Sequence, residues 1–552
     1  MGNENVLEFR LNGWLENAGV CGLINILGEE NILLTSQSIK LSVNQLENFA
    51  DHYFDFFAKN YRQLSSLTKI FSYQDQKEKF EQENFANFGQ KDYEFLATYL
   101  KSVRQYGESN SYKAVYPLLN HSTDILTVLS SLKLERLKKD QWEKETGLIM
   151  EKVKVVYQRL DQVYEYFSDP QVNKYISGKI QIYNVINKGY NNVAFLNRQQ
   201  SKDDYYESYY NFFIQPIFDY YEQDHQKDKL TCTNCGRPIK KGVPYSFLNQ
   251  MGYDVNRKTS NSWNFVNDIW MCPQCRLLYS CIPAGFSYVY SQGIFVNDNH
   301  SVKKLLQVNR AIRTRILDLN HLQVNSTNTY AAMIQTLQLE NLKQNERELN
   351  DIQVVRYENE RYYFSLLSRI LLKTLATSKA DLEPLIKGGY NIAGEYHNLY
   401  QAVISRLMNS TNLFSLLNLL QRQLLSGERT FVNSWYLMAL IRINQNFLEE
   451  LIDMEKLTAE KLERIRKDGY LFKLGYENKN KATSIGYRML NALKANDKDG
   501  YMDVLLNSYM YLGKIVPPYF NEIFLNDEHF KTIGYTFLTG LIGESKGGNE
   551  NG

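Results

Sequence analysis

The chain contains few of the residues that mark secreted or membrane proteins. Only six of its 552 residues are cysteine and ten are proline, and six cysteines are too few for a disulfide scaffold in so long a chain. No long uninterrupted apolar run occurs, and the N-terminal region has no basic segment followed by an apolar one. Neither a membrane helix nor a secretory signal is therefore predicted, and we expect a cytoplasmic protein.

The chain also lacks a charge imbalance. Lys and Arg number 63 against 61 Asp and Glu, so any surface that binds nucleic acid must come from local clustering of charge. The hydrophobic content of 43% is sufficient to fill real cores. At roughly 100–200 residues per domain, the length favours two to four domains.

Catalytic motifs are missing as well. The seven histidines are dispersed, without His-x-x-x-His or another constellation suited to metal catalysis. No Gly-x-Ser-x-Gly or dinucleotide fingerprint occurs, and Ser545 stands where a phosphate loop would need glycine before Lys546. We predict no enzyme, although residues that only folding brings together leave an unrecognised enzyme as an alternative.

Hydrophobic periodicity predicts a mainly α protein with a small β-containing, zinc-ribbon-like insert, an α+β N-terminal region and a C-terminal helical bundle. The predicted divisions are an N-terminal region at 1–230, the cysteine insert at 231–299, a mixed, mostly helical region at 300–431, and the bundle at 432–545. Locally we expect a helix over 14–27 and a capping box formed by Ser42 and Gln45. Short strands are expected over 277–282, 286–296 and 352–357.

Two Cys-x-x-Cys pairs lie within the cysteine insert. Cys232 and Cys235 form the first, Cys272 and Cys275 the second, and this is the ligand spacing of a four-cysteine zinc site. We predict one structural Zn²⁺ ion, with no open position for water. A thioredoxin-like redox role is the alternative for a Cys-x-x-Cys pair, but it needs a βαβ context that is not visible here.

Basic residues cluster beside aromatic ones in and after the insert, a composition suited to gripping phosphates and stacking on bases. An ordinary solvated face explains such charge equally well. The candidate nucleic-acid-binding residues are Lys240, Lys241, Asn249, Gln250, Arg257 and Lys258 in the insert, Lys303, Arg310 and Arg313 as a stripe on the following helix, and Lys461 and Arg464 in the bundle.

Three features together resemble a known family. They are the segment from Trp14 to Gly22, which reads Trp-Leu-Glu-Asn-Ala-Gly-Val-Cys-Gly, the paired cysteines, and the helical C-terminal region. This combination resembles the CXXC-CXXC family of CRISPR-associated proteins, the large subunit of type I-B Cascade.

The resemblance implies a non-catalytic subunit of a crRNA-guided surveillance complex in antiviral defence. Such a subunit contacts the crRNA and the backbone subunits, recognises the protospacer-adjacent motif on double-stranded DNA, helps to open the duplex, and works with a separate helicase-nuclease. Asn249, Gln250 and Lys258 are our candidates for the motif contact, since readout needs polar side chains at groove edges.

The resemblance also implies a small subunit translated internally from the C-terminal region. Met408, Met438 and Met454 are candidate starts, and Met438 fits the helical pattern best. A stand-alone zinc-ribbon DNA-binding protein of transcription or replication remains the main alternative to this interpretation.

Overall fold

The protein is described here from a computed structural model, which divides the chain into two compact units. Residues 1–324 and 355–364 form the first unit, and residues 325–354 and 365–552 form the second. The structure describes residues 6–138, 141–200, 203–240, 243–244, 247–248, 270–289, 292–317, 353–358, 360–366, 368–428 and 431–543.

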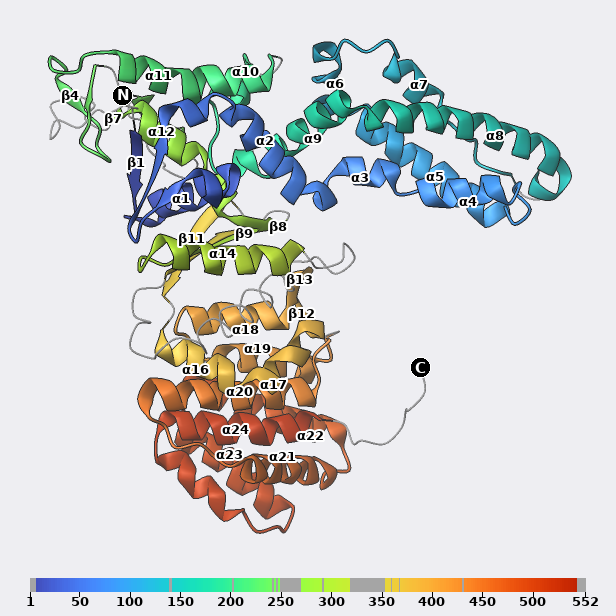
Figure 1. The fold of residues 1–552 in the computed structure, drawn as a ribbon. Coiled ribbons are helices and arrows are strands. Elements are labelled where there is room, and N and C mark those ends of the chain that lie inside the picture. Colours follow the sequence, from blue (N-terminus) through green and yellow to red (C-terminus); the bar gives the residue numbers. More distant parts are fainter. Residues whose placement is uncertain are drawn as a thin grey trace. The chain divides into compact units, whose positions relative to one another are not determined.

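The first unit combines helices with short antiparallel strands (Figure 1). Its helices are α1 (Trp14–Leu27), α2 (Phe49–Asn60), α3 (Ser66–Phe71), α4 (Gln74–Gln82), α5 (Gln90–Gly107), α6 (Asn110–Lys113), α7 (Ile125–Ser131), α8 (Gln141–Ser168), α9 (Pro170–Asn184), α10 (Tyr205–Tyr209), α11 (Gln215–Glu222), α12 (Pro273–Ser280), α13 (Ile282–Gly285) and α14 (Val302–Leu317). Its strands are β1 (Val6–Arg10), β2 (Leu33–Leu34), β3 (Ser38–Ser42), β4 (Leu230–Thr231), β5 (Pro238–Ile239), β6 (Val243–Pro244), β7 (Trp270–Met271), β8 (Ser287–Val289), β9 (Gln292–Asn297) and the greater part of β10 (Gln353–Glu358) and β11 (Arg361–Leu366).

The predicted N-terminal elements are confirmed. Strands β1, β3 and β2 form an antiparallel sheet in that order, and alternate residues of β1, Leu7 and Phe9, point into the core. The predicted capping box is present, because Ser42 accepts a hydrogen bond from a backbone amide and Gln45 accepts one from the amide of Ser42. It begins a short 3₁₀ turn that leads toward α2.

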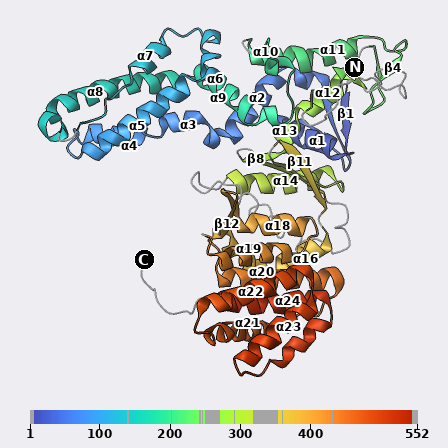
Figure 2. The ribbon, with the colours of Figure 1, turned by 180° about the vertical axis from the view of Figure 1, so that it is seen from behind.

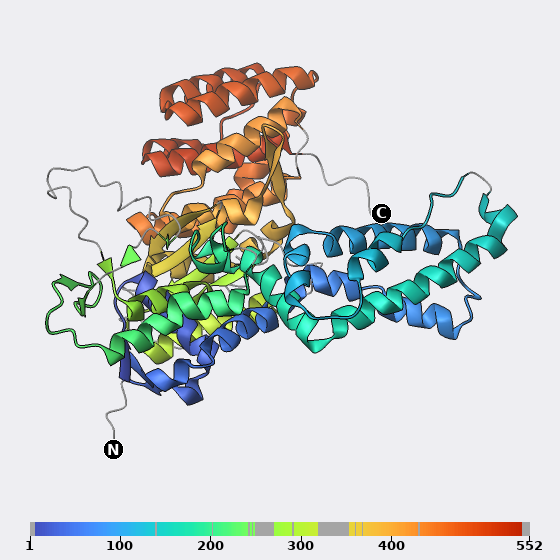
Figure 3. The ribbon, with the colours of Figure 1, turned by 90° about the horizontal axis from the view of Figure 1, so that it is seen from above.

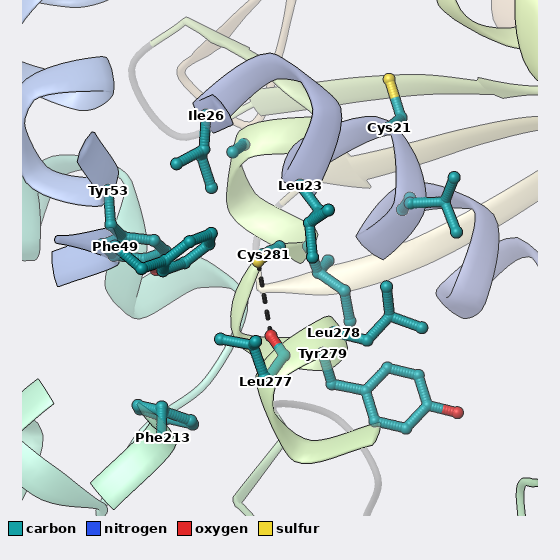
Figure 4. Close-up of a cluster of buried hydrophobic side chains, with 14 of the residues drawn as sticks. Cys21, Leu23, Ile26, Phe49, Tyr53, Phe213, Leu277, Leu278, Tyr279 and Cys281 are labelled. Atoms are coloured by element: carbon teal, nitrogen blue, oxygen red, sulfur yellow. Dashed lines mark hydrogen bonds between the residues drawn. The ribbon is translucent and has the colours of Figure 1, made fainter. Parts of the chain in front are cut away.

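Helix α1 lies against α12 and α13 with almost no space between the backbones. A Cβ at Gly22 would lie 1.9 Å from the carbonyl oxygen of Cys281, and one at Gly285 would lie 2.1 Å from that of Ala18. Figure 4 shows Cys281 among the buried side chains of this region, with its thiol donating to the carbonyl of Leu277 at 3.4 Å. Cys21 and Cys281 are both fully buried, as ordinary core thiols are.

One predicted strand is wrong. Residues 277–282 belong to α12 and the beginning of α13, not to a strand. Cys272 is the N-cap of α12, its sulfur accepting a hydrogen bond from the amide of Cys275, and Pro273 lies in the first turn. These start signals outweigh the apolar run that suggested a strand, because a capped first turn nucleates the helix.

The segment from α3 to α9 has a core of its own. Figure 3 shows the helices of this segment, coloured blue to teal, lying side by side. Tyrosine hydroxyls pair within the core, Tyr73 with Tyr157 and Tyr99 with Tyr164, each at 2.8 Å. In this core tyrosine is thus used for packing, and these four hydroxyls satisfy one another in pairs.

A second sheet has the strand order β11, β10, β9 and β8. Its strands confirm the predictions over 286–296 and 352–357. Helix α14 packs against β8 and β9. Asn309 of α14 stabilises this contact, because its side chain accepts a hydrogen bond from the amide of Val296 and donates one to the carbonyl of Val296.

The second unit is almost entirely helical (Figures 1 and 2). Its elements are α16 (Arg369–Thr377), α17 (Lys379–Leu382), β12 (Gly389–Ile392), β13 (Glu395–Asn398), α18 (Leu399–Met408), α19 (Phe414–Ser426), α20 (Ser434–Ile452), α21 (Ala459–Leu474), α22 (Lys479–Ala495), α23 (Lys498–Tyr511) and α24 (Asp527–Ile542). Helices α20 to α23 confirm the predicted series of helices in the bundle. None of the helices described in either unit is both long and apolar enough to cross a membrane.

Candidate metal centre

Two short hairpins bring the cysteine pairs together. Strands β4 and β5 pair antiparallel and enclose Cys232 and Cys235, while β6 pairs with β7, directly before Cys272. The amide of Thr233 bonds the carbonyl of Trp270 at 2.9 Å and so joins the two hairpins. Gly236 has a φ of +70°, the left-handed conformation that the turn after the second ligand requires and that glycine adopts without strain.

The four sulfur atoms form a compact cluster, which we call the metal centre. The thiols of Cys232, Cys235, Cys272 and Cys275 all lie within 4.8 Å of one another, and Cys235 Sγ is 3.6 Å from Cys272 Sγ. A tetrahedral ion with metal–sulfur bonds of about 2.3 Å separates its ligands by about 3.8 Å. The six cysteines are free of disulfides. These four thiols could therefore hold a metal ion.

Polar groups of the insert point at the sulfurs. The amide of Cys275 donates to Cys272 Sγ at 3.4 Å, Asn234 Nδ2 donates to Cys275 Sγ at 3.4 Å, and Arg237 Nη1 donates to Cys235 Sγ at 3.7 Å. Such donors stabilise thiolates, the form that binds metals. Hydrogen bonds from the neighbouring thiols, that of Cys235 foremost, hold the pKa of Cys232 below that of an ordinary thiol.

The second cysteine pair connects the metal centre to the interior of the first unit. Cys272 and Cys275 are buried and begin α12, whereas Cys235 is exposed. Arg276 is also buried, with its guanidinium 4.5 Å from the ring centroid of Phe212, and burial lowers the pKa of Arg276 to about 10. Arg276 thus packs inside the fold and is not part of a basic surface around the insert.

The structure brings the N-terminal motif and the cysteine pairs together, which spacing could not reveal. A Cβ at Gly19 would lie 2.6 Å from the carbonyl oxygen of Leu278, which follows Cys275 in α12. Tyr279 of α12 donates a hydrogen bond to Glu16 of α1. Trp14–Leu27 and Pro273–Ser280 are therefore one packed element pair.

A cavity of about 580 Å³ borders the metal centre. Arg10 and Asn12 line it from the end of β1, and Asn234 and Arg237 line it from the cysteine insert. Gln274 also lines the cavity, and its side-chain amide donates a hydrogen bond to the carbonyl of Glu8 at 2.7 Å. No linear motif predicts this cavity, because its two sides lie more than 200 positions apart in the chain.

Of the predicted nucleic-acid-binding residues in the insert, the structure describes Lys240, which is exposed after β5. The others lie outside the described residues, and their role stays a prediction. They are Lys241, Asn249, Gln250, Arg257 and Lys258.

The predicted basic stripe on α14 needs correction. Lys303 is exposed, but Arg310 donates to Asn25 Oδ1 at 3.1 Å and pairs with Glu29. Arg313 is buried, with Nη2 donating to the carbonyl of Ala284 at 2.6 Å. Residue i+10 lies about 80° around a helix from residue i, so the third position turns toward α13. The three side chains therefore do not form one exposed stripe, and of the three Lys303 alone is exposed.

In the bundle, Lys461 and Arg464 both lie on α21. Lys461 Nζ is 2.5 Å from Glu522 Oε2, and Arg464 is exposed. Contact of either residue with nucleic acid remains a prediction.

Comparison with known proteins agrees with this geometry. No curated protein and no solved structure matches the chain. Residues 225–287, which contain the metal centre, α12 and α13, match a family model described as CRISPR-associated protein, Cas_CXXC_CXXC. The cysteine insert is thus similar to that of the CRISPR-associated CXXC-CXXC family, and the match supports a CRISPR-associated protein.

Proposed function

We propose that this chain is the non-catalytic large subunit of a type I-B Cascade, a crRNA-guided complex of antiviral defence. One observation carries the proposal: the segment that matches the CRISPR-associated family also builds the metal centre and packs on the N-terminal motif. Its partners in this role are the crRNA, the backbone subunits, the target double-stranded DNA and a separate helicase-nuclease.

We assign the metal as one structural Zn²⁺ ion. Four thiolates in a tetrahedral cluster are the ligand set that zinc takes in structural sites. With four protein ligands the ion has no position for water or substrate, so the site stabilises the fold and does not supply hydrolysis. A role without catalysis agrees with the absence of a catalytic motif from the sequence.

The cavity beside the metal centre supports contact with DNA. Arg10 and Arg237 can bind phosphates or guanine edges, and Asn12 and Asn234 offer amides that suit adenine edges. In a guided complex the protein reads only a short motif, while base pairing to the guide reads the rest. We propose that this cavity, together with the predicted contact residues Asn249, Gln250 and Lys258, recognises the protospacer-adjacent motif and helps to form the R-loop.

The packing of the second unit bears on the internal small subunit. Met438 lies inside α20 and is buried, so a start there would remove the first turn of that helix. Helix α19 packs against α20, α22 and α24. A start at Met408 keeps α19 with these neighbours, and we therefore propose Met408 in place of Met438.

The experiment is to tag the protein in its native host, purify it gently and sequence the RNA that accompanies it. The proposal predicts short RNAs of uniform length that share a repeat-derived end. Absent or heterogeneous RNA, with DNA binding retained, would contradict the proposal and favour a stand-alone zinc-ribbon DNA-binding protein.

A further inference from the structure

A second cavity lies in the first unit, next to a lysine that the proposed function does not use. It has a volume of about 320 Å³, at the lower end of the roughly 300–1,000 Å³ typical of small-ligand pockets. Helix α9 supplies Gln181, Tyr183 and Asn184, and β8 supplies Tyr288. Lys188, in the 3₁₀ turn after α9, also lines the cavity. We call this the Lys188 cavity.

Two of its lining residues each have a buried polar atom that lacks a hydrogen-bond partner. Gln181 Nε2 donates to the carbonyl of Tyr61 at 3.2 Å, which fixes the amide and leaves Gln181 Oε1 without a hydrogen bond among the described residues. The hydroxyl of Tyr288 also has no hydrogen-bond partner among the described residues. Gln181 is 0% exposed and Tyr288 is 1% exposed. Buried polar atoms are normally satisfied, so two in one cavity wall point to a bound group that supplies the partners.

The remaining lining defines the charge and shape of that group. Lys188 Nζ lies 5.0 Å from the ring centroid of Tyr288, and burial lowers the pKa of Lys188 to about 8. Tyr183 is 44% exposed and offers its ring at the surface. Leu64 and Val185 complete the wall, and none of the residues described as lining the cavity is acidic. The cavity therefore suits a planar ligand that is neutral or anionic.

We propose that the Lys188 cavity binds one unstacked nucleobase. A base presents a ring N–H next to a carbonyl, which matches an amide oxygen and a phenol hydroxyl in one wall, and its face can stack on tyrosine. The lysine then faces the carbonyl or the adjoining phosphate. The inference rests on the proposed function for the source of the base, a single strand of nucleic acid. A free nucleotide has the same chemistry.

The test measures binding of the full-length protein to a short labelled single strand and to the same strand with abasic sugars. Stacking of one base on an aromatic ring supports a loss of roughly tenfold when the base is removed. Tyr183→Ala and Lys188→Met should each weaken binding of the intact strand about tenfold and abolish the difference between the two strands. Tyr183→Phe keeps the ring and should behave as wild type.

Tyr396→Ala is the matched control, because Tyr396 is similarly exposed at 56% but lies in β13 of the second unit. Adenosine and uridine monophosphate form a second arm. If they bind and Tyr183→Ala abolishes their binding while the strand is unaffected, the cavity takes a free nucleotide. If the intact strand binds all variants equally and neither nucleotide binds, the inference is overturned, whereas co-purifying guide RNA would still support the proposed function.

Discussion

The metal centre and the C-terminal helices are held together in different ways. In the second unit α21 and α24 cross so closely that a Cβ at Gly540 would lie 1.8 Å from the carbonyl of Arg466. The hairpins that carry the metal centre have strands of two residues each. Such strands bury little apolar surface. We therefore expect metal binding by the two cysteine pairs to stabilise the hairpins, as helix packing stabilises the second unit.

The largest expected effect is loss of the metal centre. Cys232→Ser should reduce bound zinc from one per chain to near zero, because a thiolate is lost and the binding free energy of a structural zinc, about 10–16 kcal/mol in peptides, is also folding free energy. Hydrogen exchange should rise in Thr231 and in α12 and stay unchanged in α21 and α24. Cys281→Ser, which keeps a donor to Leu277, is the control and should retain the zinc.

A smaller effect is expected from separating α21 and α24. Gly540→Ala should lower the free energy of unfolding of the second unit by about 3 kcal/mol, because the added methyl overlaps backbone that cannot move without shifting a helix. Thermal melting measures this change, and zinc content should stay the same. A melting temperature equal to that of wild type would show that the two helices are less tightly packed than described.

A glycine-to-alanine substitution at an exposed helix position should instead raise the free energy of unfolding. A Cβ at Gly147 of α8 meets nothing within 4 Å among the described residues. Gly147→Ala should therefore stabilise the protein by about 0.5–1 kcal/mol, because alanine favours the helix and reduces the entropy of the unfolded chain. Chemical denaturation of both variants compares the two sites directly, and destabilisation by Gly147→Ala would contradict this account of α8.

The smallest effect is expected from a surface ion pair. Lys461 and Glu522 are each about one-third exposed, so Lys461→Gln should cost less than about 1 kcal/mol. A double-mutant cycle with Glu522→Gln isolates the pair, and its coupling should shrink as salt is added. A coupling above about 2 kcal/mol would show that the pair is buried more deeply than its exposure indicates.

Local signals in the sequence predicted which four cysteines lie together. Cys-x-x-Cys spacing names all four members of the cluster, and the capping box, α1, β9 and β10 follow from short-range patterns. The error over 277–282 was avoidable in part, because Cys272 followed by Pro273 is a helix start. An apolar run alone does not distinguish a buried helix from a strand.

Tertiary features were beyond the reach of the sequence. The inward turn of Arg313 depends on which side of α14 meets α13, and no periodicity in α14 states that. The contact of Gly19 with Leu278 and the unpartnered atoms of Gln181 and Tyr288 depend likewise on elements far apart in the chain. Such sites lack a linear motif, since folding alone places their residues together.

The most direct test of the closed metal centre is X-ray absorption at the zinc edge on the purified full-length protein. The account predicts one zinc per chain with four sulfur neighbours at about 2.3 Å and no oxygen or nitrogen ligand. Fewer than four sulfurs with a bound water, or cysteines joined in disulfides without metal, would contradict it.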